Sequence, residues 1–233
     1  GGVIGGGYCN CMILDTATIS GGYCNITCGV RATIGGGRCN LVACDTWGSS
    51  ILGGENNIVC SCFSTLVSGY KNLSQGVFGF VGGGFCNNAC SSTSGCLSLG
   101  SIVVGGVGNN TNGGCFLISS CPFCTTPTTF NAGQFSFIGG GFQNNACQCY
   151  SFFVGGCCNT SSARLSSIVG GSCNTISANY CGNIIGGGIL NIINCNGGSS
   201  AIVGGSENCV GSTNGFVGGG SKNVASGAGS VIA

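Results

Sequence analysis

The chain has 233 residues, of which 50 are glycine and 22 are cysteine; only 4% are charged, and the net charge is +1. Near-zero charge with five scattered basic residues excludes the electrostatic footprint of a nucleic-acid binder, and no apolar run reaches the ~18 residues of a membrane span. Collagen would need a strict Gly-X-Y period, and disorder would need a less apolar chain than one with a mean hydropathy of +0.48. The chain must therefore bury a core.

Copies of one short motif follow one another along the chain, from VIGGGYCN through FVGGGFCN and IVGGSCN to FVGGGSKN. Each copy ends in an asparagine, which we call its anchor, and positions are counted from it. Seven of the twelve intervals between anchors are 15 residues, three are 17, and the others are 22 and 35. The anchors are Asn10, Asn25, Asn40, Asn57, Asn72, Asn87, Asn109, Asn144, Asn159, Asn174, Asn191, Asn208 and Asn223. A degenerate copy, Ile118–Cys124, falls inside the interval of 35.

Position −6 is large and apolar in every copy, and position −8 is mostly Ser, Ala or Gly. Side chains two apart in a strand share one face, so both positions are predicted to face a core. Glycines at −4 and −3 predict a tight turn, where φ is positive or the backbone approaches closely. The residues at −6 form the predicted core ladder: Ile4, Ile19, Ile34, Ile51, Leu66, Val81, Val103, Ile118, Ile138, Phe153, Ile168, Ile185, Ile202 and Val217.

A 15-residue period is too short for two packed helices and suits one coil of two short strands. The predicted fold is therefore all-β: a parallel β-solenoid, or β-roll, of about 14 coils, forming a rod on the order of 65 Å long. Residues 1–233 form one array with longer loops near 91–101 and 125–134, and we expect it to be a segment of a longer array because both ends fall inside a repeat. The anchors are predicted to form an asparagine ladder along the stack.

The copies at 166–174, 200–208 and 223–232 carry the pattern Ser-x-Val/Ile-x-Gly-Gly-x-x-Asn-x-Ala-Ser-Gly most clearly. This pattern resembles the head repeats of trimeric autotransporter adhesins and the Gly-Gly-x-x-Asn repeats of phage and viral tail fibres. The resemblance covers nearly the whole chain. It implies a left-handed β-roll, commonly a homotrimer, presented on a cell or virion surface. The repeat is slightly longer than that of adhesin heads, and the cysteine content is atypical of both groups.

Many cysteines occupy position −1, where other copies carry Lys, Gln or Glu, so this position is expected to be exposed. Coil spacing of about 4.8 Å lies within the Cα range of disulfides, although parallel neighbours can aim their Cβ atoms poorly. Cys9, Cys24, Cys39, Cys158 and Cys173 therefore form a possible disulfide ladder in an extracellular setting. Reduced thiols remain the alternative. Cys121–Cys124, Cys60–Cys62 and Cys147–Cys149 have spacings that also occur in metal or redox sites, with weak specificity.

The sequence offers few residues that could carry out catalysis. There is no histidine, the four carboxylates are spread over many coils, and the glycine runs recur in every copy without a P-loop lysine. We expect no enzyme activity and no cofactor. Position −2 is rich in aromatic residues, which form a possible interface or glycan stripe: Tyr8, Tyr23, Tyr70, Phe85 and Phe142.

The leading functional hypothesis is a rod-like surface fibre or adhesin segment, extracellular and homotrimeric. The alternative is an extracellular filament whose subunits stack end to end and are cross-linked by cysteines. An ice-binding solenoid is a third reading, although Thr16 and Thr18 are the only threonine pair in the expected register. Expected partners are further copies of the chain and, at the stripe or the long loops, a surface glycan or receptor.

Overall fold

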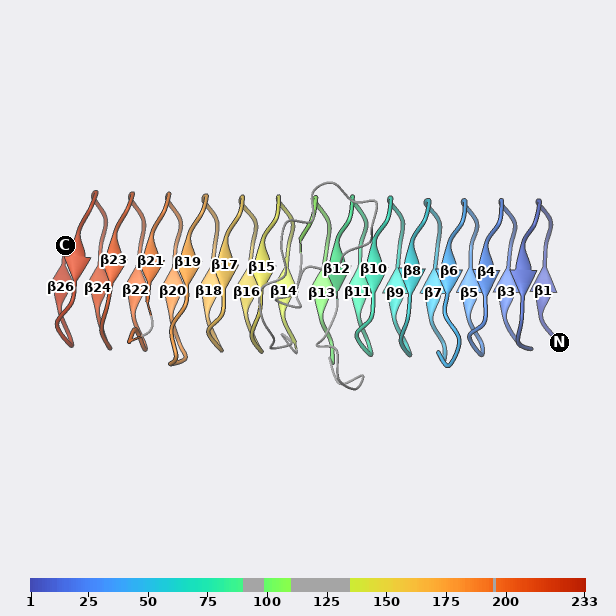
Figure 1. The fold of residues 1–233 in the computed structure, drawn as a ribbon, viewed down its shortest axis with the longest axis horizontal. Helices are drawn as coiled ribbons and strands as arrows, with labels where there is room; N and C mark the ends of the chain where they lie inside the picture. The colour runs from blue at the N-terminus through green and yellow to red at the C-terminus, as the bar shows by residue number, and fades with distance from the viewer. Residues whose placement is uncertain (90–98, 110–134, 195) are drawn as a thin grey trace.

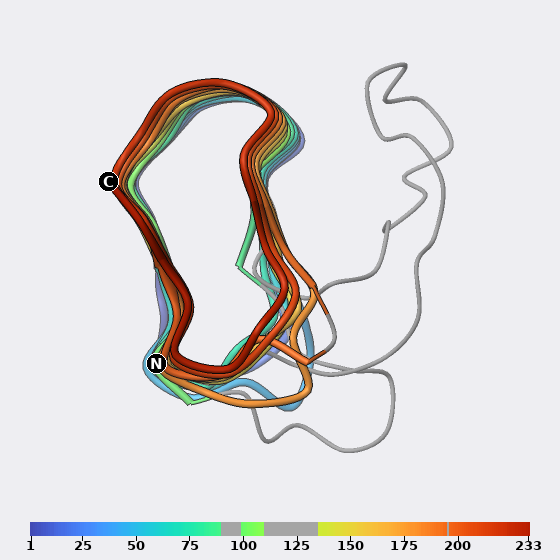
Figure 2. The same ribbon diagram turned by 90° about the vertical axis from the view of Figure 1, so that its left-hand side faces the viewer.

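The computed structural model describes residues 1–89, 99–109, 135–194 and 196–233, and within them the chain winds into a parallel β-solenoid of about 13 turns. Figure 1 shows the coils side by side along one axis, with the two termini at opposite ends. Viewed along that axis, successive coils superpose on nearly one outline (Figure 2). Fourteen strands at a spacing of about 4.8 Å give a rod about 60 Å long. The all-β solenoid with a 15-residue repeat is confirmed.

Every strand is two residues long, and every strand pair is parallel. One wall of the rod is a continuous sheet with one strand from each coil. In order, it contains β1 (Val3–Ile4), β3 (Thr18–Ile19), β5 (Thr33–Ile34), β7 (Ser50–Ile51), β9 (Thr65–Leu66), β11 (Phe80–Val81), β13 (Ile102–Val103), β14 (Phe137–Ile138), β16 (Phe152–Phe153), β18 (Ser167–Ile168), β20 (Ile184–Ile185), β22 (Ala201–Ile202), β24 (Phe216–Val217) and β26 (Val231–Ile232).

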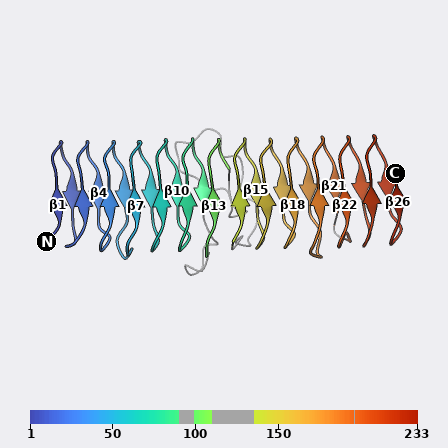
Figure 3. The ribbon, with the colours of Figure 1, turned by 180° about the vertical axis from the view of Figure 1, so that it is seen from behind.

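The strands that follow each anchor form two six-stranded sheets, which Figure 3 shows from behind. The first contains β2 (Cys11–Met12), β4 (Ile26–Thr27), β6 (Leu41–Val42), β8 (Ile58–Val59), β10 (Leu73–Ser74) and β12 (Asn88–Ala89). The second contains β15 (Asn145–Ala146), β17 (Thr160–Ser161), β19 (Thr175–Ile176), β21 (Ile192–Ile193), β23 (Cys209–Val210) and β25 (Val224–Ala225). The division falls at residues 110–134, outside the described part.

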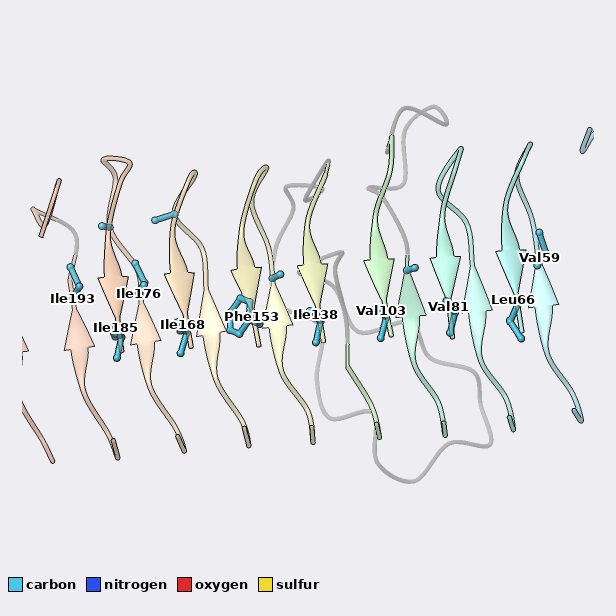
Figure 4. Close-up of a cluster of buried hydrophobic side chains, with 14 of the residues drawn as sticks. Val59, Leu66, Val81, Val103, Ile138, Phe153, Ile168, Ile176, Ile185 and Ile193 are labelled. Carbon is cyan, nitrogen blue, oxygen red and sulfur yellow. The ribbon is translucent and has the colours of Figure 1, made fainter. Parts of the chain in front are cut away.

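The core lies between these walls, as predicted. Apart from Ile4 in the first coil, which is 42% exposed, every described residue of the predicted core ladder is fully buried. In each strand that follows an anchor, the second residue faces the core ladder. Ser or Ala at position −8 fills the space beside the ladder in most coils. Figure 4 shows Leu66, Val81 and Val103 from the long sheet in one row, with Val59 and Ile176 from the opposite wall.

One predicted coil is wrong. Val103 pairs directly with Ile138, and the backbone amide of Asn144 donates to Oδ1 of Asn109 at 3.0 Å. The stack therefore passes from β13 to β14 with no coil between them. Ile118 lies in 110–134, outside the described residues. The fourteenth strand of the wall is β26, in the copy that follows the last anchor.

The predicted asparagine ladder is confirmed at all twelve steps from Asn10 to Asn223. At each step the Oδ1 atom of one anchor accepts the backbone N–H of the next, at 3.0–3.2 Å. The Nδ2 group donates to the carbonyl at −4 in its own coil and to the carbonyl at −3 in the next, as in Asn174 with Gly170 (3.1 Å) and Gly188 (2.9 Å). The ladder thereby satisfies backbone groups that the short strands leave unpaired.

The two glycine positions of the turn differ. All thirteen glycines at −3 have positive φ, and a Cβ there would meet the backbone of the next coil in every copy except the last. At −4, by contrast, Gly21, Gly53 and Gly170 have nothing within 4 Å of a built Cβ, and Ser68 replaces glycine in one coil. The glycine at −3 is therefore required in every coil that another coil follows, whereas at −4 the requirement varies, with a φ of 148–159° at Gly6, Gly36, Gly83 and Gly140.

Each coil contains a second corner with the same backbone conformation as the anchor corner. Non-glycine residues at −1 and at −9 both adopt left-handed φ, for example 57° at Cys173 and 52° at Leu165. Position −8 then takes the place of the anchor, and in one coil it is Asn183, whose Oδ1 accepts the N–H of Ser200 at 3.1 Å. A coil is therefore two similar arches, a symmetry that the sequence pattern alone did not reveal.

Three buried hydroxyl oxygens of the described residues, in Thr27, Ser74 and Ser230, have no hydrogen-bond partner, and removing one is expected to stabilise the rod. Thr27 is fully buried with Oγ1 unbonded, and the next coil has Val42 at the same position. Thr27→Val should raise the free energy of unfolding by about 1 kcal/mol, because an unpaired hydroxyl is replaced by a methyl group. Ser200→Ala is the control, since Ser200 Oγ donates to Ser212 O (2.9 Å) and accepts from Gly215 N (3.1 Å). It should lower the urea midpoint, and a lower midpoint for Thr27→Val would contradict the assignment.

Candidate functional surfaces

The residues predicted to carry function lie on the outside of the coils, and three surfaces stand out: the aromatic stripe, the cysteines at position −1, and the outward side of the long sheet. Among the described residues, no group of three or more His, Cys, Asp or Glu side chains is arranged to hold a metal ion. Cys60, Cys62, Cys147 and Cys149 belong to this part of the chain. The Cys121–Cys124 pair and most of both predicted long loops lie outside it.

The aromatic stripe at position −2 is brought together as predicted. Parallel bridges link Tyr8 to Tyr23 and Tyr70 to Phe85, and the rings of each pair stack with centroids 5.4–5.5 Å apart. Phe142 lies further along the same column, paired with Val107. Because each pair stacks along the rod axis, its rings cover one another's faces and present mainly edges to solvent. The stripe therefore offers few free ring faces on which a glycan could stack.

A second aromatic column was missed by the sequence interpretation. It lies at position −9, on the second corner of the coil. There the ring of Phe63 stacks on that of Phe78 with centroids 5.4 Å apart, and Phe135 stacks on Tyr150 with centroids 5.5 Å apart. All four are about half exposed. A search for aromatic residues three before the core ladder would have found the column, since both corners require the same exposed left-handed position.

The few charges of the described residues lie near the two corners. Arg38 pairs with Glu55 at 3.7 Å and Lys222 with Glu207 at 3.8 Å. Arg31 lies over the ring of Trp47, 4.9 Å from its centroid. Exposed ion pairs of this kind contribute about 0–1 kcal/mol to the free energy of unfolding, so they add little to the stability of the stack.

The predicted disulfide ladder is corrected by the structure. Cys9, Cys24, Cys39, Cys158 and Cys173 are all free, whereas Cys28 and Cys44 form a disulfide and Cys86 is also disulfide-bonded. The reason is geometric. In-register residues with the same φ carry parallel Cβ atoms, which stay near the coil spacing of about 4.8 Å instead of the ~3.8 Å that a disulfide needs. Cys28 and Cys44 avoid this limit because they occupy different positions in their coils, +3 and +4.

Several free thiols are shifted toward the protonated form. Burial raises the pKa of Cys147 to about 11, and burial, with a smaller contribution from Cys157, raises the pKa of Cys158 to about 11. Desolvation, followed by the neighbouring Cys9 thiol, raises the pKa of Cys24. The thiolate is the nucleophilic form, so these groups are poorly reactive at neutral pH.

The outward side of the long sheet was not singled out by the sequence interpretation. Position −7 points away from the core, and from β11 onward it carries Phe80, Ile102, Phe137, Phe152, Ser167, Ile184, Ala201, Phe216 and Val231. Position −5 adds Val104, Val154, Val169 and Val203, which are about half exposed. We call these two columns, from Phe80 to Val231, the apolar face. In the sequence, the face could have been found from the apolar residues that directly precede the core residues at position −6.

The apolar face is uncharged, and in several coils a large residue at one of its two positions lies beside a small residue at the other. A built Cβ at Gly82, Gly139 or Gly218 lies 3.3–3.5 Å from a ring atom of the phenylalanine two residues earlier, so these rings lie close over their glycines. Where position −7 is small, as at Ser167 and Ala201, position −5 is valine. No charged residue occupies either column. In the first coils the same sheet instead presents hydroxyls, at Thr18, Thr33, Ser50 and Thr65.

No protein-family model matches the sequence, and no curated protein gives a significant match. Among the described residues, no helix is long and apolar enough to cross a membrane.

Proposed function

We propose that this chain is a structural segment of an extracellular surface fibre or adhesin, in which three copies associate side by side through the apolar face. The single observation that carries the proposal is this face: an uncharged surface across nine consecutive strands, rich in partly exposed phenylalanine, isoleucine and valine side chains. Exposed apolar patches of this extent mark interaction sites. The resemblance to adhesin heads and tail fibres supplies the expectation of three copies.

The rod has the properties that a fibre segment needs. Its length grows by one strand spacing with each coil, and each coil contacts only its neighbours. The asparagine ladder runs unbroken past both long insertions, from Asn87 through Asn109 to Asn144. The insertions are therefore accommodated without interrupting the stack, which leaves them as the candidate places for receptor contact.

Lateral association makes a direct prediction about charge. In Phe152→Lys/Ile184→Lys, two ammonium groups would be buried against a partner at a desolvation cost of several kcal/mol each. We expect sedimentation equilibrium to show a trimer for the unmodified chain. The double variant should be a monomer at the same concentration, with its dissociation constant raised by about 100-fold or more.

The matched control is Thr18→Lys/Thr33→Lys, which adds the same charges to the hydroxyl-bearing end of the same sheet. It should leave the trimer intact, and circular dichroism should show that both variants keep the β-solenoid. A monomeric unmodified chain, or equal disruption by the control, would contradict the proposal.

A further inference from the structure

Five free cysteines repeat at the same corner of the coil, and we call them the cysteine ridge: Cys9, Cys24, Cys39, Cys158 and Cys173. Their backbone repeats closely. The amide of Cys24 donates to Tyr8 O at 2.8 Å and that of Cys39 to Tyr23 O at 2.9 Å, and φ is 53° at all three of the first ridge residues. Consecutive ridge residues are thus related by one coil translation.

This repetition of the backbone gives an expected spacing for the sulfur atoms. The same rotamer in consecutive coils places the Sγ atoms about 4.8 Å apart, the strand spacing. A disulfide cannot bridge that gap without moving the backbone. Two metal–thiolate bonds of about 2.3 Å, pointing in opposite directions from one ion, span about 4.6 Å. The spacing that prevents disulfides therefore matches a linear S–metal–S bridge.

The number of ligands selects the ion. No group of three or more ligating side chains is arranged around one point in the described residues, so a tetrahedral zinc site has no basis there. Soft thiolate ligands favour Cu(I), and Cu(I) and Ag(I) both accept two sulfurs in a line. Cys9 is exposed, and Cys24 and Cys39 are partly exposed, so an ion can reach them.

We propose that the cysteine ridge binds soft monovalent cations of the Cu(I) and Ag(I) type, each held between thiolates of consecutive coils. One group is the row Cys9, Cys24 and Cys39. The other is the pair Cys158 and Cys173, where the Sγ of Cys157 also lies 3.3 Å from that of Cys158. An ion bridging two thiols forms two metal–sulfur bonds and releases two protons to solvent, and no oxidation state changes. Within the row, Cys24 can bond two ions, so the row takes two ions and releases three protons.

The test uses the reduced full chain and Ag(I) alone. Ridge cysteines should be alkylated by iodoacetamide at least about tenfold more slowly with Ag(I) than without it, because bound metal removes the reactive thiolate. Peptide mass mapping reads each cysteine separately. Zn(II) at the same concentration should give no such protection.

Cys24→Ser is the decisive variant, because it leaves Cys9 and Cys39 about 9.6 Å apart, twice the strand spacing and too far for one ion. Both should lose protection, whereas Cys158 and Cys173 stay protected in the same molecules and report that the rod is intact. Cys209→Ser, off the ridge, should change neither group. The proposal is overturned if Ag(I) does not protect the ridge, if Cys9 and Cys39 stay protected in Cys24→Ser, or if Zn(II) protects equally. None of these outcomes depends on whether the chain forms trimers.

Discussion

Gly171→Ala is expected to abolish the local stack, with a loss of at least about 4 kcal/mol of unfolding free energy. Gly171 has a φ of 85°, and a Cβ there would overlap the carbonyl oxygen of Gly188 in the next coil. It would also lie 2.7 Å from Nδ2 of Asn174, the anchor of its own coil. Neither neighbour can retreat, because Gly188 is itself held in the stack by the amide of Ser172, at 2.9 Å.

The adjacent Gly170→Ala is a matched control, since it makes the same chemical change one residue away. Gly170 has nothing within 4 Å of a built Cβ and no positive φ. Its variant should stay within about 0.5 kcal/mol of the unmodified chain. Thermal and urea unfolding followed by circular dichroism would measure both. Equal losses in the two variants would show that glycine serves the turn generally and not the approach of the next coil.

Asn174→Ala should destabilise the rod by about 3–5 kcal/mol. The Nδ2 group of Asn174 donates to Gly170 O, Gly188 O and Asn159 Oδ1, and its Oδ1 accepts from Asn191 N at 3.0 Å. Alanine removes these four bonds and a fifth, from Asn191 Nδ2 to Asn174 Oδ1 (3.2 Å), and leaves the buried N–H of Asn191 without an acceptor. The loss exceeds that of an ordinary hydrogen bond because the abandoned groups cannot reach water.

Asn223→Ala provides the comparison in urea unfolding experiments. Asn223 also donates to its own turn, at Gly219 O (2.8 Å), and to Asn208 Oδ1 (3.1 Å), but it is only partly buried. Its replacement should cost less than half as much as Asn174→Ala, because water can replace the lost bonds. If the two variants lose the same stability, the ladder's contribution does not depend on burial and the account given above is wrong.

Much of the fold could be predicted because equivalent positions in a solenoid have the same environment in every coil. A position that faces the core in one coil faces it in all, so the apolar column at −6 and the anchors were visible without a structure. The predicted coil at Ile118 depended on one apolar match, and Ile118 lies outside the described residues. Its copy lacks both the anchor asparagine and the glycine at −3, where the sequence has Cys124 and Cys121. The geometry around Gly171 shows why a coil cannot omit that glycine.

The candidate surfaces were less predictable because they depend on directions and not on spacing. The expected spacing of Cys9 and Cys24 suited a disulfide, and the sequence left the directions of their Cβ atoms open. The backbone, with φ of 53° at both residues, shows that these directions are parallel. The apolar face was hidden because Phe152 and Phe153 are adjacent in sequence and point to opposite sides of the sheet. Ring stacking between Tyr8 and Tyr23 likewise follows from the coil translation, and it changes what the stripe can bind.

If the proposed function is right, copies of the rod meet through the apolar face. Cryo-electron microscopy of the full chain, with class averages viewed along the rod axis, tests it most directly. We expect three solenoid outlines around a three-fold axis, with the strands from β11 to β26 turned toward one another. Single outlines at every concentration, or copies joined end to end with this face open to solvent, would contradict it.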